Sequence, residues 1–242
     1  MTLKAVLFDF NGIIINDESI HEQLIKQILI EENLALKPGE YKEICLGRSD
    51  RTCVRDILKN RGRVVSEDYL TRLLQKKAQL YVQELEKLEK LPLYPGLEDL
   101  IFQVRSRNLK LALVSGTIRK EIEVVLERAK LAQHFCVIVA GDDIIATKPE
   151  PEGYLLAVEQ LNQAYPELNL QPNECLVIED TPAGIKAAKQ AGMQVVGVAN
   201  TYPFHMLQRQ ANWTVDYLTD LELERVQEVY SQRQCQPTAG EC

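Results

Sequence analysis

The sequence predicts an α/β fold in which a parallel sheet core carries a helical domain inserted directly after its first strand. Three observations support this prediction. Residues 4–9 form a short run that is apolar at successive positions, as in a strand buried on both faces of a parallel sheet. A helical pattern follows and continues to about Leu91. After Gly96, strand-like and helix-like segments alternate, which is typical of strands joined by crossover helices.

The first strand ends at Asp9, and Asn11-Gly12 then interrupts the apolar run. Open parallel sheets bind ligands beyond the carboxyl ends of their strands, so we expect Asp9 to be placed for chemistry. The alternative is an Asp that ends a strand and caps a turn.

The helical insertion is expected at residues 16–91, as a cap domain on a core of residues 1–15 and 92–231. Two prolines and a glycine at residues 92–96 stop its last helix. We expect residues 232–242 to form a poorly ordered polar tail. The apolar positions of its first and its longest helix are Leu24, Ile25, Ile28, Leu29, Leu70, Leu73, Leu74, Leu80, Tyr81, Leu85 and Leu88.

The remainder of the core is predicted to form a Rossmann-like parallel sheet. The expected strands are residues 110–115, 136–141, 175–180 and 194–199, with an edge strand at 213–218. The expected helices between them are residues 97–107, 119–131, 152–164 and 182–191.

The composition is that of an ordinary globular protein, with 242 residues, 45% hydrophobic residues and a formal net charge of −7. No basic stripe is present, so nucleic acid is not an expected partner. No apolar stretch approaches the roughly 20 residues of a membrane span, and no secretory signal is recognisable at the amino end. We therefore expect a cytoplasmic protein that does not bind membranes, and a monomer.

Six cysteines are scattered without a Cys-x-x-Cys pair, which predicts neither a zinc site nor a disulfide framework. Cys136 and Cys175 begin apolar runs and are expected to be small core residues. Cys235 and Cys242 flank turn-forming residues, so a disulfide between them is an alternative to a reduced tail.

Polar residues follow three further strands. Ser115-Gly116-Thr117 offers a hydroxyl and backbone N–H groups at the start of a helix, which suits a phosphate, although such a sequence also simply caps helices. Prolines flank Lys148, whose ammonium can neutralise a phosphate; a solvated surface lysine is the alternative. The adjacent Glu179 and Asp180 are costly at the end of a buried strand unless a cation compensates them, and Mg²⁺ prefers such ligands.

These motifs, in this order, resemble those of the haloacid dehalogenase superfamily, and the helical insertion and the run at residues 179–188 resemble its β-phosphoglucomutase-like subgroup. The resemblance implies that Asp9 is a nucleophile that forms an aspartyl-phosphate. It implies that Ser115 binds phosphate, that Lys148 is the motif lysine, and that Glu179 and Asp180 are the acidic metal motif.

By the same resemblance, Mg²⁺ is held by Asp9, Asp180, the backbone carbonyl of Asn11, and Glu179 directly or through water. The first motif is usually Asp-x-Asp-Gly, with the second Asp as general acid/base. Asn11 stands at that position and cannot exchange a proton. Asp17 and His21 are the nearby residues that either replace it or serve only the hinge of the cap.

Within the cap, Glu18 and His21 match hinge residues of the subgroup, and Gly47-Arg48-Ser49 resembles the loop that closes over the substrate. We expect Arg48, Ser49 and Arg51 to face the cleft as substrate-binding groups, the alternative for the arginines being a solvated surface.

Two functions remain open on the sequence alone. The first is a Mg²⁺-dependent phosphatase that acts on a small phosphorylated metabolite such as a sugar phosphate, with a weakened or reassigned acid/base step. The second is a catalytically impaired relative that binds a phosphometabolite or a protein partner. A mutase fits less well, because it uses the acid/base group twice, and Glu179 and Asp180 argue against a metal-free dehalogenase.

Overall fold

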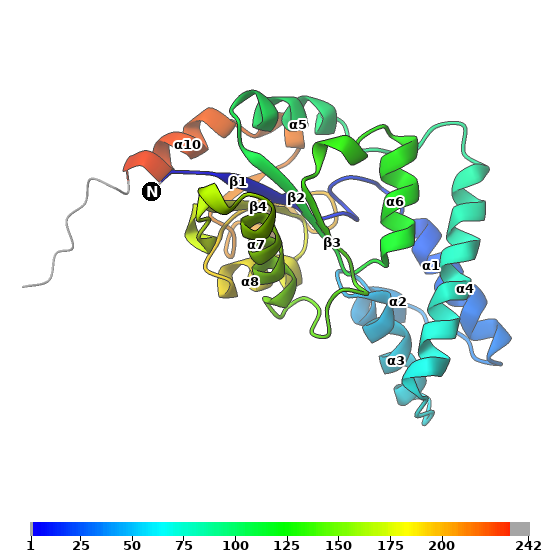
Figure 1. Ribbon diagram of the computed structural model, residues 1–242. Coiled ribbons are helices and arrows are strands. Elements are labelled where there is room, and N and C mark those ends of the chain that lie inside the picture. The colour runs from blue at the N-terminus through cyan, green and yellow to red at the C-terminus, as the bar shows by residue number, and fades with distance from the viewer. Residues whose placement is uncertain (1, 233–242) are drawn as a thin grey trace, which may run out of the picture.

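The computed structural model describes residues 2–232 and contains a parallel sheet of six strands in the order β3-β2-β1-β4-β5-β6 (Figure 1). The first strand of the chain is therefore central, and the predicted α/β fold is confirmed. The strands are β1 (Ala5–Phe8), β2 (Lys110–Val114), β3 (Val137–Val139), β4 (Cys175–Glu179), β5 (Gln194–Val198) and β6 (Trp213–Val215).

Helices cover both faces of the sheet (Figure 1). Val6 and Phe8 of β1 pack in one apolar cluster with α5, α6 and α10, whereas Ala5 and Leu7 pack on the other face with α7 and α8. All four side chains are fully buried, as expected for a strand covered on both faces. The core helices are α5 (Leu97–Ser106), α6 (Arg119–Arg128), α7 (Glu152–Ala164), α8 (Pro182–Gln190), α9 (Phe204–Leu207) and α10 (Leu223–Gln232). Short 3-10 turns lie at Ala132–His134, Pro166–Leu168, Pro172–Glu174 and Leu218–Asp220.

Four helices follow β1 and form a separate lobe: α1 (Glu18–Glu31), α2 (Glu40–Ile44), α3 (Asp50–Asn60) and α4 (Glu67–Glu86) (Figure 1). This cap has its own apolar cluster, to which α1, α3 and α4 contribute most of the side chains. The two segments that join it to the core run side by side, because the amide of Asn16 donates to the carbonyl of Pro92 and the amide of Tyr94 to that of Ile14. Among residues 2–232, none of the helices has the length and apolar character that crossing a membrane requires.

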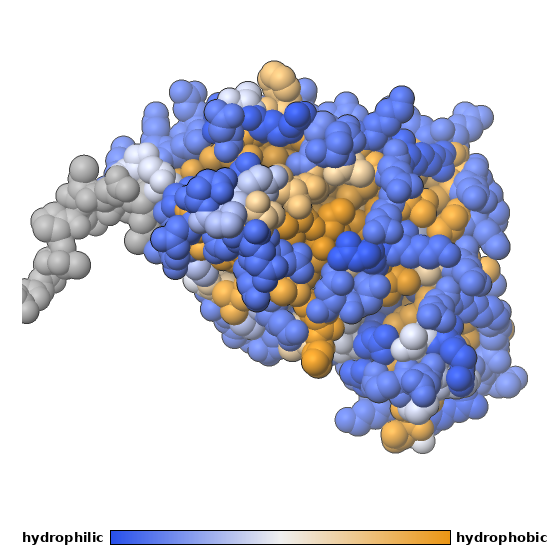
Figure 2. Space-filling view, in the orientation of Figure 1, coloured by the Kyte–Doolittle hydropathy of each residue, from blue (hydrophilic) through white to orange (hydrophobic). Residues whose placement is uncertain are grey.

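The surface in Figure 2 is mostly hydrophilic, with hydrophobic residues gathered in the middle of this face near the β3 edge of the sheet.

The cysteines differ from expectation at two places. Cys45 and Cys53 form a disulfide with a Cα–Cα distance of 4.6 Å, because α2 and α3 fold back on each other around the loop between them. Spacing along the chain could not show this approach. Cys136 is exposed rather than a core residue, because it precedes the short strand β3 at the side of the sheet, whereas Cys175 is buried as expected. Cys235 and Cys242 lie outside the described residues.

The disulfide closes a loop in the cap, so it stabilises the folded state by restricting the unfolded chain. Replacing Cys45→Ser together with Cys53→Ser is expected to lower the free energy of unfolding by roughly 2 kcal/mol in urea titrations. Cys136→Ser, at an exposed free thiol, is the matched control and is expected to change it by under about 0.5 kcal/mol. Equal stability of the double variant and the wild type, both without reductant, would contradict the bond.

Candidate active site

The carboxyl ends of the three central strands meet at one edge of the sheet. Phe8 of β1 pairs in register with Leu113 of β2 and with Ile178 of β4. The polar residues that follow these strands are therefore neighbours, and the amide of Asp9 donates to the carbonyl of Ile178 at 3.0 Å. The convergence expected from the sequence is present in the structure.

Lys148 lies at the centre of this edge. Its Nζ is 2.6 Å from Oδ1 of Asp9 and 2.6 Å from Oε1 of Glu179, and it also donates to the carbonyl of Val114. Burial alone would lower the pKa of Lys148, but the charges of Asp9 and Glu179 outweigh it and hold the pKa well above the ordinary value. The lysine is therefore a fixed cation beside Asp9 and not a solvated surface group.

Asp180 is the least compensated group in this cluster. Both of its carboxylate oxygens are buried without a hydrogen-bond partner among residues 2–232. Burial raises its pKa well above the ordinary value, the charges of Glu179 and Asp9 raise it further, and the nearby side chains of Thr201 and Lys148 lower it by less. Gly12 permits this arrangement, since its φ is +82° and a Cβ there would lie 1.8 Å from Oδ2 of Asp180.

The three carboxylates fit a metal ion. Asp9, Glu179 and Asp180 each offer an oxygen, and these atoms lie within 4.8 Å of one another. Burial, and then the charge of Glu179, raise the pKa of Asp9 to about 7, against the lowering effect of Lys148. These buried carboxylate oxygens are hard ligands, and those of Asp180 lack a hydrogen-bond partner among residues 2–232. A divalent cation would bind such oxygens and neutralise their charge.

The phosphate-binding residues expected after β2 lie beside this cluster. Ser115, Gly116 and Thr117 all line the cavity between core and cap. Oγ of Ser115 accepts a hydrogen bond from the amide of Thr117 at 3.0 Å, which shapes the turn that leads into α6. A Cβ on Gly116 would lie 3.0 Å from Cα of Ser49, so the cap loop passes close over this turn.

Asn11 is held from both ends of its side-chain amide. Its Nδ2 donates to Oδ1 of Asp17 at 2.9 Å and lies 3.0 Å from Nε2 of His21. Its Oδ1 accepts a hydrogen bond from the hydroxyl of Thr117 at 2.6 Å. The amide therefore bridges the hinge of the cap and the turn at residues 115–117, but it carries no transferable proton.

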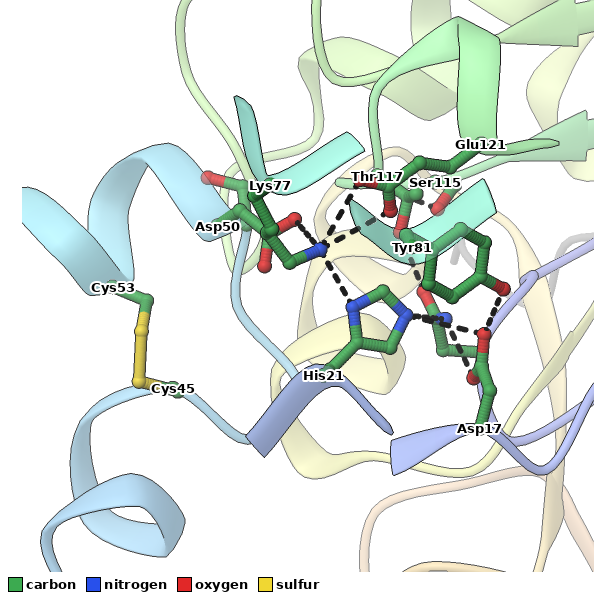
Figure 3. Close-up of polar contacts among 12 residues, drawn as sticks. Asp17, His21, Cys45, Asp50, Cys53, Lys77, Tyr81, Ser115, Thr117 and Glu121 are labelled. Carbon is green, nitrogen blue, oxygen red and sulfur yellow. Dashed lines mark hydrogen bonds and ion pairs between the residues drawn. A yellow bond between two sulfur atoms is a disulfide. The ribbon is translucent and has the colours of Figure 1, made fainter. Parts of the chain in front are cut away.

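A buried charged network continues from His21 into the cap (Figure 3). The fully buried Nζ of Lys77 lies 2.7 Å from Nδ1 of His21, 2.6 Å from Oδ2 of Asp50 and 3.1 Å from Oε2 of Glu121. Tyr81 donates to the carboxylate of Asp17 at the other end. Because Lys77 belongs to α4 and Glu121 to α6, the network connects cap and core.

Sequence reasoning missed Lys77, although a signal for it exists. Lys77 follows Leu70 and Leu74 and precedes Tyr81 at helical spacing, so it lies on the apolar stripe of α4 and not on the polar face. A charged residue in such a stripe is expected to have a buried partner. Its partners Asp50 and Glu121 are distant in sequence and gave no signal of their own.

The charges of the network shift the pKa values of the hinge residues. Burial raises the pKa of Asp17, but the charge and hydrogen bond of His21 outweigh burial and hold that pKa below its ordinary value. Burial and Lys77 lower the pKa of His21, whereas Asp17 raises it, to about 9 in total. Nδ1 of His21 accepts a hydrogen bond from Lys77 only while it bears no proton, so this contact fits the tautomer whose proton is on Nε2, which lies 3.1 Å from Oδ2 of Asp17.

The expected cap residues divide into two groups. Ser49 is buried and lines the cavity, and its hydroxyl lies 3.4 Å from that of Thr147 in the loop that carries Lys148. Arg48 also lines the cavity, although its guanidinium is 2.9 Å from the carboxylate of Asp56.

Arg51 does not line the cavity, contrary to expectation. Its position on α3 directs its guanidinium towards α4, where it pairs with Glu67 at 2.9 Å and donates to Thr71. Sequence position next to the loop therefore did not decide which way the side chain points.

Fold and site together define a capped α/β enzyme of the hydrolase type, with a carboxylate cluster, a fixed lysine and the turn at residues 115–117 at one sheet edge. The family model of the haloacid dehalogenase-like hydrolases matches residues 6–198. The chain belongs to this family, in the β-phosphoglucomutase-like subgroup, as its motifs indicated.

Similar proteins cover nearly the whole chain. β-Phosphoglucomutase from Bacillus subtilis is 29% identical over 232 residues, which cover 95% of this chain and 96% of that protein. The phosphorylated carbohydrates phosphatase of Thermotoga maritima is 27% identical, over 82% of this chain and 87% of that protein. The crystal structure of β-phosphoglucomutase from Clostridium difficile has a TM-score of 0.82 at 27% identity and covers 97% of this chain and 100% of that one.

Removing the ammonium of Lys77 leaves the buried carboxylates of Asp50 and Glu121 without their cation. Lys77→Ala is therefore expected to lower the free energy of unfolding by about 3–5 kcal/mol in urea titrations. Lys76→Ala is the matched control, because Lys76 is its neighbour and forms an exposed pair with Glu31; its expected cost is under about 1 kcal/mol. Equal effects of the two substitutions would show that the buried network does not stabilise the fold.

Proposed function

We propose that this protein is a Mg²⁺-dependent phosphatase that hydrolyses a small phosphorylated metabolite, such as a sugar phosphate, through an aspartyl-phosphate on Asp9. The observation that carries the proposal is the buried carboxylate of Asp180, which lacks a partner in the described part of the chain and lies beside Asp9. The names of the relatives, a phosphomutase and a phosphatase of phosphorylated carbohydrates, support the same substrate class.

Asp9, Glu179, Asp180 and the backbone carbonyl of Asn11 are the groups that would hold Mg²⁺. The bound cation would supply charge neutralisation, so that an anionic phosphate can approach Asp9.

The free carboxylate oxygen of Asp9 attacks phosphorus, and the bond from phosphorus to the leaving oxygen breaks. Lys148 stabilises negative charge on the phosphoryl oxygens while it holds Asp9 in place. Ser115 and the amides at Gly116 and Thr117 orient the phosphoryl group. Water then attacks phosphorus, the bond from phosphorus to the carboxylate oxygen of Asp9 breaks, and the proton that water loses returns to the group that protonated the leaving oxygen.

Protonation of the leaving oxygen is the step for which the usual proton donor is absent. An alkoxide requires a proton as it departs, and the amide of Asn11 cannot supply it. His21 lines the cavity and lies 3.0 Å from Asn11, so it is the residue best placed to take over this role. General acid/base groups typically contribute about 10²–10⁴-fold, and turnover of alkyl phosphates is accordingly slow.

The second candidate function is a protein that binds a phosphometabolite or a protein partner without efficient turnover. The hydrogen bonds that hold Asn11 to Asp17 and Thr117 favour it, since they engage this side chain in structure instead of in proton transfer. Both candidates use the same phosphate and metal groups, and they differ in rate.

The leaving group distinguishes these accounts. Asn11→Asp is expected to raise kcat for an alkyl phosphate such as glucose 6-phosphate by about 10²-fold or more, because it restores the missing proton. For p-nitrophenyl phosphate, whose leaving group departs without protonation, the expected gain is under about tenfold. Steady-state assays with Mg²⁺ measure both values.

The control for this experiment is Asp9→Asn in each background, which removes the nucleophile and is expected to abolish hydrolysis of both substrates. Similar gains on the two substrates would refute the role given to position 11. Undiminished hydrolysis by Asp9→Asn would refute the proposed nucleophile.

A further inference from the structure

The cavity has two halves with different chemistry. It is lined both by residues that follow the core strands and by residues of the cap. The core half contains the carboxylate cluster, Lys148 and the phosphate-binding turn. The cap half faces the part of the substrate that is not the reacting phosphate, and its charges therefore decide which substrates fit.

Three carboxylates outside the cluster of Asp9, Glu179 and Asp180 line the cavity. Glu18 and Asp50 line it from the cap, and the exposed Glu150 lines it at the rim beyond Lys148. Oε1 of Glu18 accepts a hydrogen bond from the hydroxyl of Tyr41 at 2.6 Å, and Oδ2 of Asp50 accepts one from Lys77. The second oxygen of each has no partner among residues 2–232, so it remains an acceptor for a substrate hydroxyl or ammonium.

The two basic side chains that line the cavity besides His21 already form ion pairs with carboxylates of this chain. Besides His21, the described residues that line it include two basic side chains, Arg48 and Lys148. Lys148 is bound to Asp9 and Glu179 on the core side. Arg48 pairs with Asp56 at 2.9 Å and also donates to the carbonyl of Ile44. His21 faces the carboxylate of Asp17 at 3.1 Å. A second anionic group on the substrate would therefore meet Glu18 and Glu150 and no unpaired cation among the described residues that line the cavity.

From this charge arrangement, and resting on the proposed function, we propose that the protein selects polyol monophosphates, neutral or amine-bearing, and rejects substrates with a second phosphate or a carboxylate. Carboxylates accept hydrogen bonds from sugar hydroxyls and attract an ammonium, whereas they repel an anion in a partly desolvated cleft. Glu18 and Glu150 thus determine specificity by repulsion as well as by attraction, whereas the charge of Asp50 is paired with Lys77.

The test is a series built on one sugar, assayed as kcat/KM with Mg²⁺. Relative to glucose 6-phosphate, we expect glucosamine 6-phosphate to react equally well or better. Glucose 1,6-bisphosphate and 6-phosphogluconate are expected to react at least about tenfold less efficiently. A bisphosphate or phosphogluconate that reacts as well as glucose 6-phosphate would overturn the proposal.

Variants assign the selectivity to particular carboxylates. Glu18→Gln combined with Glu150→Gln retains hydrogen-bond acceptors but removes two negative charges, and it should raise the ratio of bisphosphate to monophosphate efficiency at least about threefold. Glu22→Gln is the matched control, because Glu22 belongs to the same helix, is exposed, and pairs with Lys26 away from the cavity. An unchanged ratio in the double variant would overturn the assignment.

A separate readout keeps this proposal distinct from the proposed function. Turnover of p-nitrophenyl phosphate, which carries no second charged group, tests the phosphatase activity alone. If that turnover is absent, the phosphatase proposal fails, and the same preference is measured as relative Kd values of the four sugar phosphates by calorimetry with Mg²⁺. Tighter binding of the bisphosphate than of glucose 6-phosphate would then overturn the specificity proposal independently.

Discussion

The site depends on the compensation of three carboxylates that the sheet forces together out of water. Parallel pairing of β1 with β4 places Asp9 beside Glu179 and Asp180. Lys148 contacts two of them, at 2.6 Å each, and leaves Asp180 without a partner in the described chain. One ammonium against three buried carboxylates leaves excess negative charge, which a divalent cation would neutralise.

The same constraint explains why the first strand must be central and apolar. Asp9 reaches the sheet edge only because β1 is buried on both faces between β2 and β4. Gly12 then turns the chain away so closely past Asp180 that no side chain fits. The chain next enters the hinge of the cap, where Asn11, Asp17 and His21 connect the sheet edge to the buried network around Lys77. Cap position and active-site hydrogen bonding are therefore physically linked.

Much of this arrangement could be predicted from local sequence. Short apolar runs located the strands, because burial on both faces imposes a continuous apolar pattern, and the polar residues after them converge because parallel strands end at one edge. What failed depends on directions and distances in three dimensions. The pairing of Cys45 with Cys53 follows from the way α2 and α3 pack, and the outward direction of Arg51 follows from its contact with Glu67. Helix α10 was not predicted, although Leu223, Val226 and Tyr230 lie buried at helical spacing.

The central claim, that the carboxylate cluster is built for a divalent cation, is tested most directly by calorimetric titration of the protein with Mg²⁺. The account predicts one Mg²⁺ per chain for the wild type, affinity lower by about tenfold or more for Asp180→Asn, and no change for Asp99→Asn, which removes an exposed carboxylate on α5. Equal Mg²⁺ affinity of Asp180→Asn and the wild type would contradict it.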